Sequence, residues 1–522
     1  MKKIYADLFY IRKKGISEFL KSELWPISEE RFNKFCNTSS EFYYKKILNE
    51  NKITFSIGLI DSYFIYFLNQ YISYNYVSNY CKKNKINFFY SNESKFFRNP
   101  NWQKIEFYFR DYYKISFKDK LNFFFRNLIK TLLLSKFNFL NKKYIIDFGS
   151  LSYEKKFFYK KNKKKIIFKN YKTFINKYSK RKVNYKSLIK CNNDLFYIKI
   201  IKPYLDEIKN IDPDLVQYLD FENLSKIWQK RNKWLISLYL NLINTDLPKV
   251  EYYFSNIARI DHKFLIILLQ DKNHKVYCFN HGNEICHLER NYSYNYMLSF
   301  TKNYLVENKI IKRNFEELSQ KRFLEKKTNT KFISIGSDTF NKYRNINISR
   351  KTNVQNKKNK IILVGYPMTV LRDIGEPALF FNYQIKIEYN LISILKNLKN
   401  YNFIYKVHPD RIKEISNVYP LNEKQISFEK FENIISPGDI IFHTHTTSTT
   451  FFFSLNIKCP IILVESFNYK WNKAVKKQIL KRIEILKPKN SSDFVFDRHN
   501  IIDSIKNAKT KIDLNLMNDI TG

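Results

Sequence analysis

Residues 437–465 read PGDIIFHTHTTSTTFFFSLNIKCPIILVE, and this stretch predicts a strand, a polar loop, a helix and a second strand. Residues 439–442 and 460–464 are short apolar runs of the kind found in buried parallel strands. Between them lies a loop rich in histidine and threonine, followed by a helix over residues 448–455 with Thr447 or Ser448 as its N-cap. Ligands of such sheets bind beyond the carboxyl ends of the strands. The helix start is therefore a candidate phosphate site, because it offers free N–H groups and a partial positive charge.

A second polar loop follows the strand predicted over residues 403–407. His408 and Pro409 come directly after it, and Pro409 ends the strand because proline cannot donate a ladder hydrogen bond. Each motif alone also fits an ordinary polar loop, but together they favour one phosphate site at the carboxyl edge of the sheet. A lone glycine after the strand predicted over residues 360–364 is weaker evidence. The candidate phosphate-binding residues are His408, Pro409, His443, Thr447, Ser448, Thr449, Thr450 and Gly365, of which His443 either binds or only orders its loop.

The chain has 522 residues and a formal net charge of +44, from 92 Lys and Arg against 48 Asp and Glu. This length allows two or three domains, and 44% hydrophobic residues exclude general disorder. The positive charge suits an anionic membrane surface, a nucleotide-linked donor or nucleic acid. No helix-turn-helix, zinc-finger or RNA-binding motif accompanies the charge, so nucleic acid is not the expected partner.

The cysteines and the apolar runs indicate the compartment. None of the six cysteines forms a CxxC pair, and a reducing cytoplasm is the default expectation. The N-terminus lacks the apolar run of a signal peptide. The most apolar stretch, residues 60–77, is interrupted by Asp61, Asn69 and Gln70, so we expect no membrane-spanning helix. The lysine-rich residues 153–190 are either a solvated insertion or a peripheral contact with the inner face of the cytoplasmic membrane.

The chain is expected to be α/β, with two domains. Residues 1–345 form the first, with the basic insertion near 153–190, and residues 361–522 form the second, a Rossmann-like domain. Residues 346–360 are polar and aperiodic, which is typical of a linker. In the first domain, short strands are predicted at residues 53–57, 144–148 and 276–279, the last of which ends in Asn280-His281-Gly282.

The order of these strand-end motifs resembles a family of sugar transferases encoded in bacterial surface-polysaccharide gene clusters. More loosely, it is similar to capsule transferases and to CDP-glycerol glycerophosphotransferases. The matching pieces span roughly residues 245–465, and they are residues 254–256 (FSN), 280–282 (NHG), 406–409 (KVHP), 446–451 (TTSTTF) and 456–460 (NIKCP). The resemblance implies a GT-B-like fold, in which two Rossmann-like domains face a cleft. It also implies transfer of a sugar, with inversion, from a nucleotide-sugar donor to a surface-polysaccharide or lipid-linked acceptor.

In such an enzyme the candidate phosphate-binding residues would hold the donor. His281 would be the catalytic base that deprotonates the acceptor hydroxyl, with Glu284 as the second candidate. The alternative for His281 is a structural role, as a histidine that is hydrogen-bonded in a turn. No DxD motif stands in a donor-like context, so neither a metal nor another cofactor is expected.

One departure from the resemblance concerns the donor ribose. Related sequences often place an acidic residue shortly after the Ser/Thr cluster, where this chain has Phe452 and Phe453, and the next acidic residue is Glu465. Two other functions stay open on the sequence. One is transfer of a polyol phosphate from a CDP-linked donor, and the other is a non-catalytic, basic, nucleic-acid-binding protein.

Overall fold

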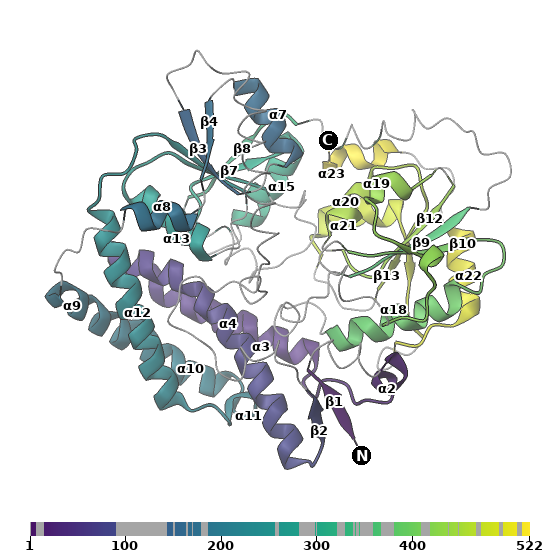
Figure 1. Cartoon of the computed structure of the whole chain (residues 1–522), viewed down its shortest axis with the longest axis horizontal. Helices are drawn as coiled ribbons and strands as arrows, with labels where there is room; N and C mark the ends of the chain where they lie inside the picture. The colour runs from purple at the N-terminus through teal and green to yellow at the C-terminus, as the bar shows by residue number, and fades with distance from the viewer. Residues whose placement is uncertain are drawn as a thin grey trace.

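The structure is a computed structural model of the whole chain. It describes residues 2–6, 15–89, 144–149, 152–162, 165–169, 171–178, 186–255, 260–280, 298, 300–320, 329–337, 340, 344, 359–366, 381–408, 418–436, 438–446, 448–465, 471–489, 494–508 and 514–521. Within these residues two parallel six-stranded sheets lie side by side, and a group of long helices lies along one side of the first (Figure 1). The chain is therefore an α/β protein, as expected.

The first sheet has the strand order β4-β3-β5-β6-β7-β8, and all of its pairings are parallel. Its strands are β3 (Tyr144–Phe148), β4 (Lys165–Phe168), β5 (Glu251–Phe254), β6 (Val276–Phe279), β7 (Asn303–Val306) and β8 (Lys331–Ser334). The helices that accompany it are α7 (Tyr153–Asn162), α8 (Tyr171–Tyr178), α13 (Ile260–Asp271) and α15 (Lys309–Gln320). The chain leaves β3 in one direction for β4 and returns on the other side for β5, so the strand order reverses between β3 and β5.

The second sheet has the order β11-β10-β9-β12-β13-β14, and it is also parallel. Its strands are β9 (Lys360–Val364), β10 (Asn402–Lys406), β11 (Ile426–Ser427), β12 (Ile440–His443), β13 (Ile461–Val464) and β14 (Glu484–Leu486). Its helices are α18 (Phe381–Leu395), α19 (Phe431–Ile434), α20 (Thr449–Leu455), α21 (Lys473–Arg482) and α22 (Arg498–Asn507). In sequence order these strands lie 3-2-1-4-5-6, which is the order of dinucleotide-binding folds.

The N-terminal residues are mostly helical, which corrects one prediction. The helices are α2 (Ile16–Leu20), α3 (Glu29–Leu48), α4 (Lys52–Lys83), α9 (Lys186–Phe196), α10 (Lys202–Ile211), α11 (Pro213–Val216) and α12 (Phe221–Ile243), beside a parallel pair formed by β1 (Lys3–Tyr5) and β2 (Asn87–Phe89). The strand predicted at residues 53–57 is wrong, because these residues begin α4. Asn51 caps that helix and accepts a hydrogen bond from the Thr54 N–H at 3.0 Å.

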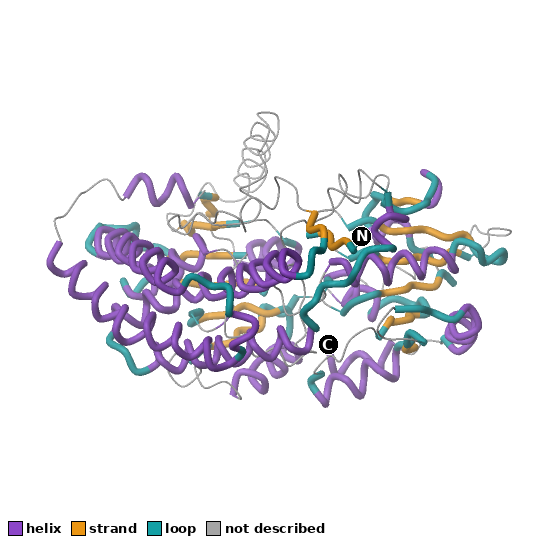
Figure 2. Tube along the Cα trace, turned by 90° about the horizontal axis from the view of Figure 1, so that it is seen from below, coloured by secondary structure: helices purple, strands orange, loops and turns teal. Residues whose placement is uncertain are grey.

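The apolar stretch over residues 60–77 lies inside α4, among the other helices (Figure 1). In the view from below, helices lie on either side of the strands (Figure 2). Asp61, Asn69 and Gln70 are fully buried there, and the Asp61 carboxylate accepts a hydrogen bond from Arg231 Nε at 2.8 Å. The stretch is thus part of a protein core. Among the residues described, no helix combines the length and the apolar character needed to cross a bilayer.

The C-terminal helix α23 (Asn518–Thr521) joins the two halves of the chain. The Thr521 carbonyl accepts a hydrogen bond from Asn308 Nδ2, at the start of α15 beside the first sheet. The Thr521 hydroxyl donates to Asn456 Oδ1 at 3.0 Å, just after α20 beside the second sheet. Arg344 Nη2 also donates to this hydroxyl, at 2.8 Å. The expected linker lies between β8 and β9, and its residues 346–358 are outside the described residues, so the domain boundary stays a prediction.

Candidate functional site

The candidate site lies at the carboxyl edge of the second sheet, where the strand order reverses between β9 and β12. Open α/β sheets bind their ligands in the crevice at such a point. Tyr366, just after β9, packs edge-on against His445, just after β12, with ring centroids 4.6 Å apart. His408 follows β10, the neighbour of β9, and is half-buried. The two sequence motifs therefore follow strands whose carboxyl ends lie at the same edge of one sheet, with β9 between them.

The start of α20 has the predicted cap. Ser448 is the N-cap, and its hydroxyl accepts a hydrogen bond from the Phe451 N–H at 3.1 Å. Thr449 is exposed and Thr450 is half-buried, so the first turn of the helix is accessible. The first N–H groups of a helix have no acceptor within the helix. This turn can therefore donate hydrogen bonds to an anion.

His443 lies beneath α20, away from solvent. Its side chain is fully buried, and its Nε2 lies 2.9 Å from the Ser454 hydroxyl, which itself donates to the Thr450 carbonyl. The ring also packs edge-on against Phe451, with centroids 5.3 Å apart. Burial lowers the pKa of His443 to about 3, so the ring is neutral near pH 7. This setting favours a structural role for His443, which joins α20 to β12.

The low pKa of His443 predicts a specific loss of stability in acid. Between pH 7.5 and 5.0 the unfolded chain gains a proton at this ring, whose ordinary pKa is near 6.5, while the folded chain does not. Protonation of the unfolded state therefore lowers the free energy of unfolding by about 2 kcal/mol over this range, from 1.36 kcal/mol per pH unit below 6.5. His443→Asn should reduce the pH dependence of urea unfolding by that amount.

A buried polar network lies under the same edge and was not predicted from the sequence. The Glu388 carboxylate, on α18, accepts hydrogen bonds from the Tyr366 N–H at 2.7 Å, the Tyr405 hydroxyl at 2.6 Å and the Tyr419 hydroxyl at 2.7 Å. The side-chain amide of Gln384 donates to the Thr444 hydroxyl at 2.6 Å. In the sequence, Glu388 stands in an apolar helical pattern and resembles an exposed charge. Through these hydrogen bonds the buried Glu388, on α18, holds both the turn after β9 and strand β10.

Gly365 has a packing reason to be glycine. A Cβ at this position would lie 2.3 Å from the Tyr405 hydroxyl, which is held by Glu388. The turn after β9 therefore has no room for a side chain. An ordinary turn at the end of a strand, the alternative to a phosphate loop, accounts for Gly365 without a ligand.

Arg482, at the end of α21, fixes the far end of α20. Its side chain is 2% exposed, and its Nη2 donates to the carbonyls of Ser454 at 3.3 Å, Ile457 at 2.6 Å and Cys459 at 3.0 Å. Its Nε donates to the Leu455 carbonyl at 3.2 Å. Burial lowers the pKa of this guanidinium to about 10, which keeps it charged near neutral pH. The candidate helix is therefore anchored by its cap at one end and by Arg482 at the other.

Phe452 and Phe453 lie on the buried face of α20. They are 2% and 3% exposed, and the Phe453 ring packs edge-on against Phe431 with centroids 5.5 Å apart. A carboxylate at position 453 would be buried among aromatic rings. The position therefore suits phenylalanine for packing, and an acidic side chain there would not face solvent.

The first sheet also has a polar edge at its reversal point. Gly149 follows β3 with φ of 129°, and a Cβ there would lie 2.1 Å from the Ser255 hydroxyl, which follows β5. The Ser255 Oγ is buried and has no hydrogen-bond partner among the described residues. After β6, Asn280 donates to the Glu307 carboxylate at 2.9 Å and accepts from the Tyr304 hydroxyl at 3.2 Å. Glu307 thus fixes Asn280, the residue that precedes His281 in the sequence.

The described residues include six of the ten predicted site residues. These are His408, His443, Ser448, Thr449, Thr450 and Gly365, all at or below the carboxyl edge of the second sheet. His281, Glu284, Pro409 and Thr447 lie outside the described residues, and their roles stay predictions. Among the residues that are described, no three His, Cys, Asp or Glu side chains are grouped in a way that could hold a metal ion. No family model, no curated protein and no solved structure matches the chain.

Proposed function

We propose that this chain is a metal-independent GT-B-type glycosyltransferase that moves a sugar from a nucleotide-sugar donor to a surface-polysaccharide or lipid-linked acceptor. The observation that carries the proposal is the second sheet. Its strand order is that of dinucleotide-binding folds, and its reversal point lies beside His408 and the capped start of α20. The first sheet supplies a second polar edge for the acceptor, around Gly149, Ser255 and Asn280.

The proposed reaction is a single displacement at the anomeric carbon. A base, His281 or Glu284, removes the proton of the acceptor hydroxyl, and the acceptor oxygen forms a bond to the anomeric carbon of the sugar. The bond from that carbon to the donor phosphate breaks, and its electron pair stays on the departing nucleoside diphosphate. His408, the hydroxyl protons of Ser448 and Thr449, and the N–H groups of the first turn of α20 stabilise this negative charge. No step in this scheme requires a metal ion or another cofactor.

Loss of a phosphate-binding group should weaken nucleotide binding selectively. Removing one charge-assisted hydrogen bond, worth about 1.5–3 kcal/mol, lowers affinity by roughly tenfold to a hundredfold. We expect this result for His408→Ala and Ser448→Gly, measured by calorimetric titration with CMP, CDP, UDP and GDP. Glycine is chosen at position 448 because it retains most of the capping free energy that alanine loses.

Ser28 provides the matched control, because it caps α3 in the same way and accepts from the Arg31 N–H at 3.2 Å. Ser28→Gly should change neither nucleotide affinity nor, by more than a few tenths of a kcal/mol, stability. If His408→Ala and Ser448→Gly melt much earlier while the folded fraction binds nucleotide normally, the residues are structural and the proposal fails. A product in which phosphate has moved together with a polyol would assign the site to polyol-phosphate transfer instead.

A further inference from the structure

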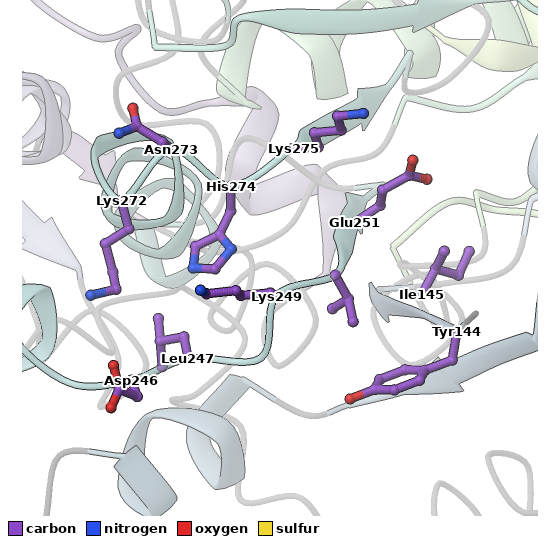
Figure 3. A pocket seen from close by; sticks show the side chains of 11 residues that line it. Tyr144, Ile145, Asp246, Leu247, Lys249, Glu251, Lys272, Asn273, His274 and Lys275 are labelled. Atoms are coloured by element: carbon purple, nitrogen blue, oxygen red, sulfur yellow. The ribbon is translucent and has the colours of Figure 1, made fainter. Parts of the chain in front are cut away.

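A large cavity lies at the amino edge of the first sheet, away from the reversal point just described (Figure 3). Its volume is about 800 Å³, and it is lined by the segment before β5, the turn before β6 and the first residues of β3. Cavities of this size hold small organic ligands. None of the sequence motifs falls in it.

Three nitrogen-bearing side chains gather at one end of the cavity. Figure 3 shows Lys249, Lys272 and His274 together there, while Lys275 and Glu251 extend toward the other end. The turn that carries Lys272 and His274 is fixed by Asn273, whose φ of 60° closes the end of α13, and by the His274 N–H, which donates to the Leu269 carbonyl at 2.9 Å. The cationic end of the cavity is therefore built on defined backbone.

The three side chains at this end differ in how firmly other residues hold them. The Lys272 ammonium donates to the Ile243 carbonyl at the end of α12, and the His274 ring packs edge-on against Tyr252 with centroids 5.4 Å apart. In the described part of the chain, Lys249 makes no hydrogen bond or ion pair. Lys272 and His274 are thus held in place, and the Lys249 ammonium is available to a ligand.

Among the described residues, the charge at this end is balanced only in part. The pKa of His274 is lowered by burial first, and then by the positive charges of Lys272 and Lys249. Asp246 faces Lys272 and raises its pKa, but burial outweighs that effect and the pKa of Lys272 is lowered. The Glu251 carboxylate is engaged by the Tyr253 hydroxyl at 3.0 Å. An anion between the two lysines would therefore relieve their repulsion.

A smaller cavity, of about 190 Å³, adjoins the first at Tyr144 and extends the basic character. It is lined by Lys169 and Lys177, which are both exposed, and by Tyr178, whose ring lies 5.3 Å from the Lys177 ammonium. Tyr144 and Leu247 give the larger cavity an apolar wall. The site thus offers positive charge for an anionic group and apolar surface for the organic group attached to it.

We infer that this cavity binds the phosphoryl group of a phosphate ester, held by Lys249, Lys272 and the His274 imidazole. The phosphoryl group carries up to two negative charges and several acceptor oxygens, which matches two ammonium groups and one ring N–H. The ester belongs either to a soluble metabolite or to the headgroup of a phospholipid. The inference does not depend on the proposed function. The cavity lies at the amino edge of the first sheet, whereas the proposed donor site lies at the carboxyl edge of the second sheet.

The test uses sn-glycerol 3-phosphate as the soluble probe and glycerol as its neutral counterpart. Vesicles of phosphatidylcholine, with and without phosphatidylglycerol, are the lipid probe. Lys249→Met/Lys272→Met should weaken binding of the cognate probe by about tenfold or more, because charge-assisted hydrogen bonds are lost. Lys473→Met/Lys477→Met on α21 removes two exposed lysines, and so the same net charge, and should leave binding unchanged.

The two probes identify the source of the phosphoryl group. Binding of glycerol 3-phosphate alone that depends on the cavity lysines assigns a soluble ester. Binding of phosphatidylglycerol vesicles with the same dependence assigns a headgroup. Equal losses in the two lysine pairs, or no binding of any probe, would overturn the inference. Lys249→Met alone is the second variant, because this side chain makes no hydrogen bond or ion pair with the described residues. A change at Lys272, in contrast, also removes its bond to the Ile243 carbonyl.

Discussion

Replacing Arg482 by methionine is expected to lower the free energy of unfolding by about 4 kcal/mol. The guanidinium donates four hydrogen bonds to carbonyls between Ser454 and Cys459, all in a buried position. Bonds that involve a charged group contribute about 1.5–3 kcal/mol each, and the loss of even two of them reaches this value. Methionine fills a similar volume but leaves these carbonyls without a donor. Denaturant unfolding, followed by circular dichroism, measures the change.

Two further variants separate hydrogen bonding from the effect of charge. Arg498→Met removes an exposed guanidinium and should change stability by no more than about 0.5 kcal/mol. Arg482→Lys keeps the charge but replaces the planar group by a single ammonium, so it should fall between the wild type and Arg482→Met. If Arg482→Met were as stable as Arg498→Met, the carbonyls would be satisfied by other donors, and Arg482 would not be the anchor of α20.

The parallel strands were the most predictable part of this fold. Runs such as residues 361–364 and 461–464 are uniformly apolar because both faces of the sheet are covered, and the structure confirms both as strands. The cap at Ser448 was also predictable, since a serine before an apolar helix is a local signal. These features depend on residues that are close together in the sequence, and so they could be predicted without knowledge of tertiary contacts.

The N-terminal helices were harder to predict, because they are buried on most sides. The start of α4 lacks a polar face, and a short apolar run of this kind fits a strand and a buried helix equally. The π-helical turn at Tyr197–Ile201, between α9 and α10, likewise has no sequence signature that we recognised. Helix length and capping at Asn51 decide the outcome in α4, and both depend on residues beyond the run itself.

The supports of the candidate site could not be predicted, because they join residues far apart in the chain. Arg482 contacts carbonyls 23 to 28 positions earlier, and Glu388 accepts from Tyr419, 31 positions later. In the sequence, both residues resemble ordinary surface charges. The sequence located the edge of the sheet that carries the candidate residues, and the structure shows which side chains hold that edge.

In the lysine-rich segment, too, composition did not predict which charged side chain is buried. Composition alone places every lysine of residues 153–190 on the surface. The structure confirms exposure for Lys156, Lys160 and Lys161, but Lys155, in the first turn of α7, is fully buried. Its ammonium lies 2.5 Å from the Asp147 carboxylate, which is on β3. Lys155 therefore belongs to the core of the first sheet and not to a membrane-contacting surface.

This buried pair gives the second large effect that we expect. Asp147→Asn should lower the free energy of unfolding by about 3–5 kcal/mol, because it removes the carboxylate that faces a buried ammonium. The Tyr159 hydroxyl donates to the other oxygen of Asp147 at 2.6 Å, and asparagine can still accept that bond through Oδ1. The lost stability should therefore come from the charge. Asp206→Asn is the matched control, because Asp206 and Lys209 form an exposed pair at 3.4 Å and its loss should cost less than about 1 kcal/mol.

The double variant Asp147→Asn/Lys155→Met distinguishes an ion pair from a packing defect. Replacing both members of a buried pair by groups of similar volume is often neutral, since the cost of burying the two charges disappears with them. The double variant should therefore recover most of the stability that Asp147→Asn loses, and the coupling in the double-mutant cycle should exceed about 2 kcal/mol. Additive losses would show that β3 and α7 need the shapes of these side chains and not their charges. In that case the turn at Gly149, between β3 and α7, would be positioned by packing alone.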